Sequence, residues 1–185
     1  MIEPGLAAKL LAVDGALDAA RVEHAFGGAI ALGYYAEPRA TADIDCNVFV
    51  RVEDRAPVLD ALAALGVATD VDEHALVRDG RARLWWGRTP LDLFFSYDPF
   101  HDAMARGVRR VPFGDATIAI LGPEHLVVCK AVFDRRKDWL DIEQVLVCVP
   151  SFDVGEVRRW LPAIVGPDDP RVGRFEDLAV AFLGG

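Results

Sequence analysis

Lysine is nearly absent from this chain of 185 residues, in which 20 Lys and Arg face 29 Asp and Glu. Only Lys9, Lys130 and Lys137 are lysines, so arginine supplies almost all of the positive charge. The formal net charge of −9 excludes a protein that coats long nucleic acid, because that mode of binding needs a basic surface. A local basic site inside an acidic protein stays open. We therefore expect no extended DNA-binding surface.

Cysteines and long apolar runs are scarce as well. The three cysteines, Cys46, Cys129 and Cys148, have no CxxC spacing, which excludes a zinc site and predicts buried thiols in a reducing compartment. No apolar run approaches the roughly 18 residues of a membrane helix. The first residues lack the basic and apolar regions of a secretory signal. We therefore expect a cytoplasmic protein without membrane contact.

The first two thirds of the chain mix helical and strand-like patterns, whereas the last third is helical. Apolar spacing and alternation separate the two classes, and glycine next to aspartate predicts hairpin turns at residues 79–80 and 114–115. The expected helices are 6–20, 29–36, 54–65, 98–106, 124–134, 137–147, 154–161 and 171–183. The expected strands are 23–26, 43–52, 71–77, 82–86, 90–95, 108–112 and 117–121.

This order of elements predicts an α+β fold, with a mixed sheet flanked by helices and a C-terminal helical bundle. The change in pattern near Gly122 and Pro123 predicts an α/β core over residues 1–122 and a helical subdomain over residues 123–185.

Two neighbouring glycines, Gly27 and Gly28, lie between an expected strand and an expected helix. Glycine lets the backbone approach a ligand closely, and the amide groups at a helix N-terminus suit a phosphate. A tight turn that requires glycine is the alternative explanation.

Three aspartates are candidates for a metal site. Asp43 and Asp45 are two residues apart on an expected strand, so their carboxylates point to one face, where a cation would offset their repulsion. Asp92 lies in an apolar strand and needs a partner there. If the two strands are neighbours, three carboxylates converge and suit Mg²⁺ or Mn²⁺. The alternatives are a hydrated strand end for the first two, and an arginine partner such as Arg88 or Arg39 for Asp92.

A second candidate cluster lies in the helical third. Lys130 is in the middle of an apolar helix face and needs an anion, either a triphosphate or a carboxylate such as Asp134 or Asp141. Asp138 and Asp141 are three residues apart and share a helix face. The alternative is an internal salt-bridge network that ties two helices together.

Together these motifs resemble the nucleotidyltransferase (polymerase-beta-like) superfamily. The resemblance rests on Gly27-Gly28, on Arg39-x-Thr41-x-Asp43-Ile44-Asp45 and on the later Asp92. The helical stretch from Pro123 through Lys130 to Lys137-Asp138-x-x-Asp141 is similar to the AbiEii-like, toxin-type branch. The spacing departs slightly from the usual motif, because 14 residues separate Gly28 from Asp43. The tail after Pro150 matches no pattern that we can name.

The resemblance implies transfer of a nucleoside monophosphate from an NTP to an acceptor hydroxyl, with release of pyrophosphate. It implies that Mg²⁺ or Mn²⁺ binds to Asp43, Asp45 and Asp92, of which Asp92 completes a second metal site or acts as the base. Catalytic roles fall to these aspartates, Lys130 and Asp141. Nucleotide binding falls to Gly27, Gly28, Arg39, Thr41, Lys130 and Asp138. The acceptor is a small molecule, a protein or a tRNA end.

Two other functions remain open. The fold is also compatible with a non-catalytic binding module of a toxin–antitoxin pair, whose partner would be an antitoxin protein. A metal-dependent phosphoesterase is the other alternative, although His101-Asp102 has no second histidine ligand close by in the sequence. Arginines alternate with Trp85 and Trp86 on an expected strand pair, which suits either an RNA end or a solvated hairpin.

Overall fold

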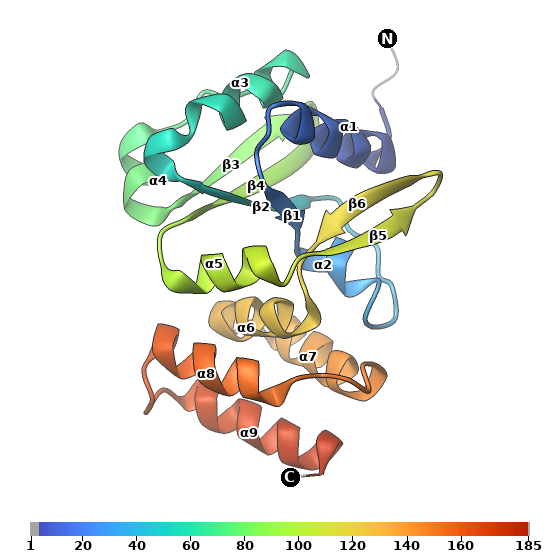
Figure 1. Cartoon of the computed structure of the whole chain (residues 1–185), viewed down its shortest axis with the longest axis vertical. Helices are drawn as coiled ribbons and strands as arrows, with labels where there is room; N and C mark the ends of the chain where they lie inside the picture. Colours follow the sequence, from blue (N-terminus) through green and yellow to red (C-terminus); the bar gives the residue numbers. More distant parts are fainter. Residues whose placement is uncertain (1–3, 185) are drawn as a thin grey trace. The chain divides into compact units, whose positions relative to one another are not determined.

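The computed structural model describes residues 4–184 (Figure 1). Contacts divide these residues into two compact units, each built from two stretches of chain. Unit 1 comprises residues 4–30 and 40–121, and unit 2 comprises residues 31–39 and 122–184. The fold class is confirmed as α+β, with a mixed sheet, flanking helices and C-terminal helices.

A six-stranded sheet forms the core of unit 1, with the strand order β3-β4-β2-β1-β6-β5. β2 runs parallel to β4 and β1 parallel to β6, whereas the other neighbours are antiparallel. Alternate residues of β2, namely Ile44, Cys46 and Val48, are almost fully buried. The strands are β1 (His24–Phe26), β2 (Ile44–Arg51), β3 (Arg81–Trp86), β4 (Thr89–Ser96), β5 (Arg109–Phe113) and β6 (Ala116–Ile120).

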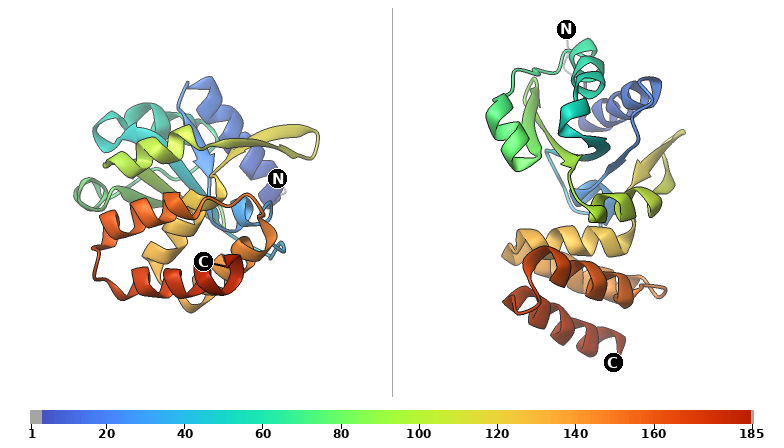
Figure 2. Two further views of the ribbon diagram at one scale, coloured as in Figure 1. Left: turned by 60° about the horizontal axis from the view of Figure 1, so that its bottom comes forward. Right: turned by 60° about the vertical axis from the view of Figure 1, so that its left-hand side comes forward.

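Helices cover both faces of this sheet. α1 (Leu6–Ala19) and α3 (Ala56–Ala64) contact each other on one side, and α5 (Pro99–Arg106) lies on the other side against β2 (Figure 1; Figure 2, right). A short 3-10 helix, η1 (Val52–Asp54), follows β2. The helix α2 (Gly28–Leu32) begins at the second glycine of the pair, and the chain passes from unit 1 to unit 2 within this helix.

One predicted strand of unit 1 is wrong. Residues 71–77, expected as a strand, belong mostly to the helix α4 (Glu73–Asp79). The Asp72 carboxylate accepts hydrogen bonds from the backbone N–H groups of His74 and Ala75, and therefore caps this helix. Gly80 ends it in the left-handed conformation, with φ of 62°. Asp79 and Gly80 are thus a helix end rather than the expected hairpin turn.

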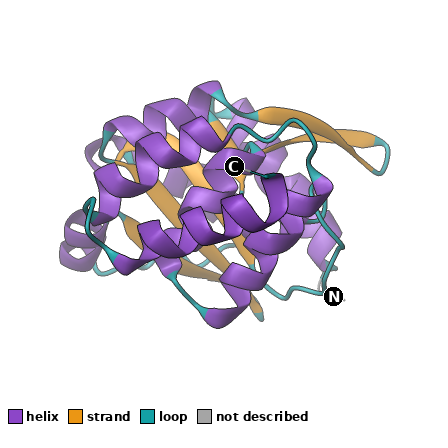
Figure 3. Cartoon of the chain, turned by 90° about the horizontal axis from the view of Figure 1, so that it is seen from below, coloured by secondary structure: helices purple, strands orange, loops and turns teal. Residues whose placement is uncertain are grey.

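Unit 2 is a helical bundle. Its C-terminal stretch consists of α6 (Pro123–Phe133), α7 (Arg136–Cys148), α8 (Val154–Val165) and α9 (Pro170–Leu183). The helix α6 contacts all three of the others, and α8 and α9 run side by side (Figure 2, left). The loops between these helices are short (Figure 3). None of the helices within residues 4–184 combines the length and the apolar character that a membrane-spanning segment requires.

The cysteines differ in their exposure. Cys46 is buried in the central strand β2, and Cys129 is partly buried. Burial raises the pKa of the Cys46 thiol, and the charges of Asp14 and Asp45 raise it further. The expectation of buried thiols is wrong for Cys148, which is exposed at the end of α7.

Candidate functional site

A row of charged side chains crosses one face of the unit 1 sheet. The register pairs Asp45 of β2 with Asp92 of β4, and it pairs Asp92 with Arg83 of β3. Directly paired residues project from the same face with Cβ atoms about 5 Å apart. Asp43 precedes Asp45 by two residues, at the start of β2. We call these four residues the acidic row: Asp43, Asp45, Asp92 and Arg83.

The Arg83 guanidinium grips Asp92 with two hydrogen bonds. Arg83 Nε donates to Asp92 Oδ1 at 2.7 Å, and Nη2 donates to Oδ2 at 2.6 Å. The bonds to Asp92 raise the pKa of Arg83, and the negative charges of Asp92, Asp43 and Asp45 raise it further. Asp92 therefore has an arginine partner, which is Arg83 rather than the expected Arg88 or Arg39.

The glycine pair lies against Asp45. The backbone N–H of Gly27 donates to the carbonyl oxygen of Asp45 at 2.9 Å. Gly28 has φ of 53°, which side-chain-bearing residues rarely adopt. A Cβ atom at position 28 would lie 2.7 Å from Asp45 Cγ and would overlap the carboxylate oxygen Oδ2. Glycine is thus required at position 28 by both the backbone and the Asp45 side chain.

Thr41 holds the first aspartate of the row. Its hydroxyl donates a short hydrogen bond to Asp43 Oδ1. The backbone N–H of Asp43 in turn donates to Thr41 Oγ1 at 3.4 Å. Thr41 thereby orients the Asp43 carboxylate at the point where the chain enters β2.

The acidic row fits Mg²⁺ or Mn²⁺ in the chemistry of its donors. Its carboxylates supply only oxygen ligands, which these cations prefer, and the lack of a Cβ at Gly28 makes room for the Asp45 carboxylate itself. Among the described residues, no group of three or more His, Cys, Asp and Glu side chains is already arranged around a metal position. The third carboxylate, Asp92, is instead bound by Arg83.

The second predicted cluster forms an ion network within unit 2. Lys130 Nζ of α6 donates to Asp141 Oδ2 of α7 at 2.6 Å and lies 3.8 Å from Asp138 Oδ1. The side chains of Lys130, Asp138 and Asp141 are at most 7% exposed. This network joins two helices, as the structural alternative for Lys130 predicted, and Asp141 rather than Asp134 is the main partner of Lys130.

Two arginines complete this network at its edge. Arg135 binds Asp138 through Nε at 2.6 Å and Nη2 at 3.0 Å, and the Asp138 carboxylate also accepts the Arg135 backbone N–H. Arg39 Nη2 lies 3.3 Å from Asp141 Oδ2. Three cations thus contact the two carboxylates of this network. Arg39 is 38% exposed, so it can meet a solute, whereas Lys130 is enclosed.

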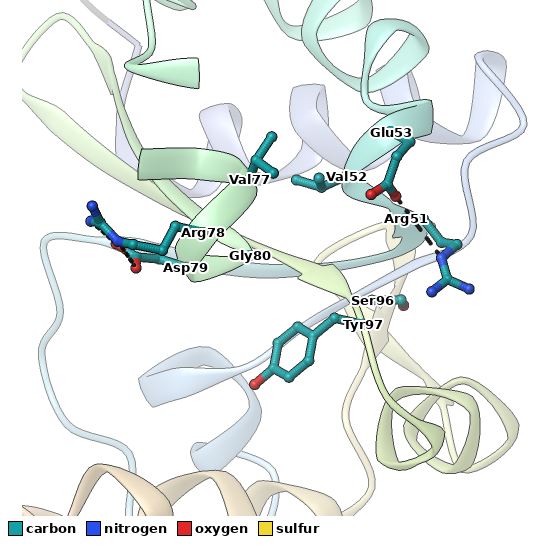
Figure 4. A pocket seen from close by; sticks show the side chains of 9 residues that line it. All are labelled: Arg51, Val52, Glu53, Val77, Arg78, Asp79, Gly80, Ser96 and Tyr97. Atoms are coloured by element: carbon teal, nitrogen blue, oxygen red, sulfur yellow. Dashed lines mark hydrogen bonds and ion pairs between the residues drawn. The ribbon is translucent and has the colours of Figure 1, made fainter. Parts of the chain in front are cut away.

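A separate cavity of about 360 Å³ lies at the other end of β2 and β4 (Figure 4). Arg51 and Ser96, which are paired at the carboxyl ends of these strands, line it together with the exposed Tyr97. Both arginines at its rim have carboxylate neighbours, Arg51 at 3.9 Å from Glu53 and Arg78 at 2.8 Å from Asp79. The residues around this cavity include none of the predicted site residues.

Known structures share the architecture of this chain, although no family model and no curated sequence matches it. The solution structure of the antibiotic-resistance factor ANT(2'')-Ia superposes with a TM-score of 0.61 and 15% identity, and the match covers 95% of this chain and 97% of that one. The chain has a nucleotidyltransferase-like fold. An antigenic nucleotidyltransferase-like protein from Paracoccidioides brasiliensis gives a TM-score of 0.52 and 14% identity, with 92% of both chains covered.

The nucleotidyltransferase-like fold agrees with the superfamily resemblance of the sequence. The AbiEii-like branch and the toxin-type role stay predictions, as do the roles assigned to the individual residues. The structure places Gly27, Gly28, Thr41, Asp43, Asp45 and Asp92 in unit 1, and Arg39, Lys130, Asp138 and Asp141 in unit 2.

Sequence reasoning missed Arg83 as a member of the candidate site. The signal was present, because β3 and β4 are joined by a two-residue turn between Trp86 and Thr89. Counting backwards and forwards from that turn pairs Arg83 with Asp92. At the level of sequence, the arginines of β3 instead had two explanations, contact with an RNA end or a solvated hairpin.

Proposed function

We propose that the protein is a nucleotidyltransferase that moves a nucleoside monophosphate from an NTP to an acceptor hydroxyl. The acidic row carries the proposal, since the register of β2 and β4 brings Asp45 beside Asp92 on one sheet face, with the glycine pair against Asp45. The nucleotidyltransferase-like fold supports it. Phosphoryl transfer depends on positioning and charge neutralisation, which carboxylates and a metal supply without covalent participation by the protein.

In this proposal, the acceptor oxygen attacks the α-phosphorus, the bond from that phosphorus to the bridging oxygen breaks, and pyrophosphate leaves. Asp43 and Asp45 hold Mg²⁺ or Mn²⁺, which neutralises charge on the phosphates. Asp92 either joins them as a ligand or takes the proton of the acceptor hydroxyl. The glycine pair and the start of α2 give the backbone close access to the phosphates.

The network of unit 2 has a supporting role in this proposal. Lys130 holds Asp141, and Asp141 holds the partly exposed Arg39. Arg39 is the more exposed of the two cations bound to Asp141, and its role in this proposal lies within unit 2. Lys130 and Asp138 then act by fixing the helix α7 and its carboxylates.

A small molecule with hydroxyl groups is the acceptor to test first. One structural neighbour, ANT(2'')-Ia, is an antibiotic-resistance factor. Protein side chains and a tRNA end are the other acceptor classes. With a formal charge of −9, an RNA acceptor would be contacted at an end or a short stem rather than along a groove.

The test is transfer of label from each of the four NTPs, with Mg²⁺ or Mn²⁺, to small-molecule alcohols, total RNA and a mixture of proteins. We expect transfer by the wild type and a loss of about 100-fold or more in Asp45→Asn, because even outer-shell changes at metal sites cost about 10- to 100-fold. The control Asp115→Asn removes an exposed carboxylate of the same unit and should keep the full rate. A wild type without metal-dependent transfer to any acceptor, or a fully active Asp45→Asn, would contradict the proposal.

A further inference from the structure

We infer that Arg83 is a positioning residue that holds Asp92 as an internal counter-ion and releases part of this hold when a divalent metal binds to the acidic row. The inference rests on the proposed function for the presence of the metal. In this inference, Arg83 competes with the metal for the Asp92 carboxylate, and this competition sets how tightly the metal binds.

The geometry makes Arg83 a competitor rather than a bystander. Both oxygens of Asp92 accept a hydrogen bond from the Arg83 fork, at 2.7 Å and 2.6 Å. A metal ligand must direct an oxygen lone pair at the cation, and a carboxylate held along both oxygens by a planar guanidinium has its orientation fixed by that partner. Asp92 therefore needs at least one of these bonds to lengthen before it can turn toward a cation beside Asp45.

The exposure of the pair allows this exchange. The Arg83 side chain is 55% exposed on the edge strand β3, whereas Asp92 is 16% exposed. A guanidinium at an edge can swing into water at little cost, since ion pairs with an exposed partner contribute little to stability. The carboxylate stays in place while its partner leaves.

The electrostatics of the row point in the same direction. Arg83 lies in the field of all three carboxylates, because Asp92, Asp43 and Asp45 all raise its pKa. One positive charge therefore opposes an incoming cation at the position where three negative charges attract it. Removal of that charge should strengthen metal binding, whereas a side chain with only a structural role would leave it unchanged.

The experiment titrates the full chain with Mn²⁺ alone and measures free Mn²⁺ by electron paramagnetic resonance. The variants are Arg83→Gln, Arg83→Lys and the double variant Arg83→Gln with Asp92→Asn. The control is Arg81→Gln, which removes the same charge from an exposed position two residues earlier on β3. Circular dichroism of each variant verifies that the fold is kept.

We expect Arg83→Gln to bind Mn²⁺ about tenfold more tightly than the wild type, in line with loss of one unit of repulsion a few ångströms away in a partly solvated site. Arg81→Gln should stay within about twofold of the wild type, since its position is farther from Asp92. Arg83→Lys should lie between the wild type and Arg83→Gln, because it keeps the charge and loses the fork. The double variant should lose the gain.

Equal Mn²⁺ affinities in Arg83→Gln and Arg81→Gln would overturn the inference, as would a gain that survives in the double variant or no Mn²⁺ binding in any variant. These outcomes are separate from the transfer assay. Tighter Mn²⁺ binding by Arg83→Gln together with no nucleotidyl transfer by the wild type would contradict the proposed function alone. Transfer by the wild type with equal affinities in the two glutamine variants would contradict this inference alone.

Discussion

Asp92 in unit 1 is paired with a guanidinium whose side chain is 55% exposed, whereas Lys130 in unit 2 is 5% exposed and meets carboxylates that are equally enclosed. Both regions join cations to carboxylates at bond lengths of 2.6 to 2.7 Å. Bond length therefore does not distinguish the two, but access to water does. A pair at a sheet edge can exchange its partner for a ligand, whereas an enclosed pair holds the scaffold together.

The largest effect should come from the enclosed network. Lys130→Met leaves Asp138 and Asp141 buried with one cation fewer, and breaking a buried ion pair costs about 3 to 5 kcal/mol. We expect a loss of unfolding free energy near the lower figure, since Arg39 and Arg135 remain. Urea unfolding of the full chain measures it.

The control for this variant is Lys137→Met, which removes an exposed lysine near the start of α7 and should stay within about 0.5 kcal/mol of the wild type. A loss below about 1 kcal/mol in Lys130→Met would show that the network is not a scaffold. The contrast between the two regions would then fail.

The second effect concerns the backbone beside the acidic row. Gly28→Ala places an alanine in a left-handed backbone conformation and brings its Cβ into overlap with the Asp45 carboxylate. Gly114→Ala has the same type of backbone conformation, with φ of 60°, but its Cβ meets no atom within 4 Å. We expect a loss of about 1 kcal/mol for Gly114→Ala and about 2 kcal/mol for Gly28→Ala. Thermal and urea unfolding measure both. Equal losses would indicate that Asp45 moves aside at no cost.

The third effect is the smaller stability change at the sheet edge. Arg83→Gln removes an exposed partner, so it should cost less than about 1 kcal/mol, and the difference should shrink in high salt. Urea unfolding at two salt concentrations measures this. A loss as large as that of Lys130→Met would mean that Arg83 is part of the scaffold and cannot exchange.

The smallest effect should come from a surface ion pair of unit 2. Hydrogen bonds from the Arg171 side chain, and then from its backbone N–H, lower the pKa of Asp169 to about 2. The ion pair therefore stabilises the fold above the usual aspartate pKa of about 4, and its contribution is lost as the pH falls toward 2.

Asp169→Asn tests this, because asparagine keeps the helix cap of α9 and does not titrate. The wild type should be the more stable protein near pH 6, and the difference between the two proteins should narrow from about pH 4 downward. Unfolding curves over this range measure the difference. A difference in unfolding free energy between the two proteins that is independent of pH would show that the charge of Asp169 does not contribute to stability.

Local sequence patterns predicted most of the fold, and they predicted the strands that carry Asp45 and Asp92. Alternation placed the strand of Asp45, and the apolar run placed that of Asp92, because both strands have strong local signals. The short helix α4 was predicted as a strand because Val71 and Val77 are residues typical of strands. The Asp72 carboxylate caps the first turn and stabilises the helix instead. Neighbouring strands were assumed, and the register confirmed that Asp45 and Asp92 lie side by side.

Partner choice was less predictable. The partner of Lys130 depends on how α6 and α7 pack, which no spacing along the chain fixes, and Asp134 is excluded as its main partner because it accepts the Trp139 indole N–H at the start of the next helix. The partner of Asp92 depended on the hairpin register, which was readable from the turn after Trp86. Long-range contacts within a helical bundle need the packed structure, whereas contacts across a tight hairpin do not.

Residues 31–39 belong to unit 2 although they lie between two stretches of unit 1, and this has a consequence for folding during synthesis on the ribosome. These residues belong to a unit whose other part starts at residue 122, so they emerge long before the helices that they join. Arg39 can bind Asp141 only after a further 102 residues have been synthesised. The strand β1 likewise lacks its second neighbour in the sheet until β6 has been synthesised. Unit 1, with the acidic row, is therefore complete in sequence once residue 121 has been synthesised, whereas unit 2 is complete only when the C-terminal helices have been added.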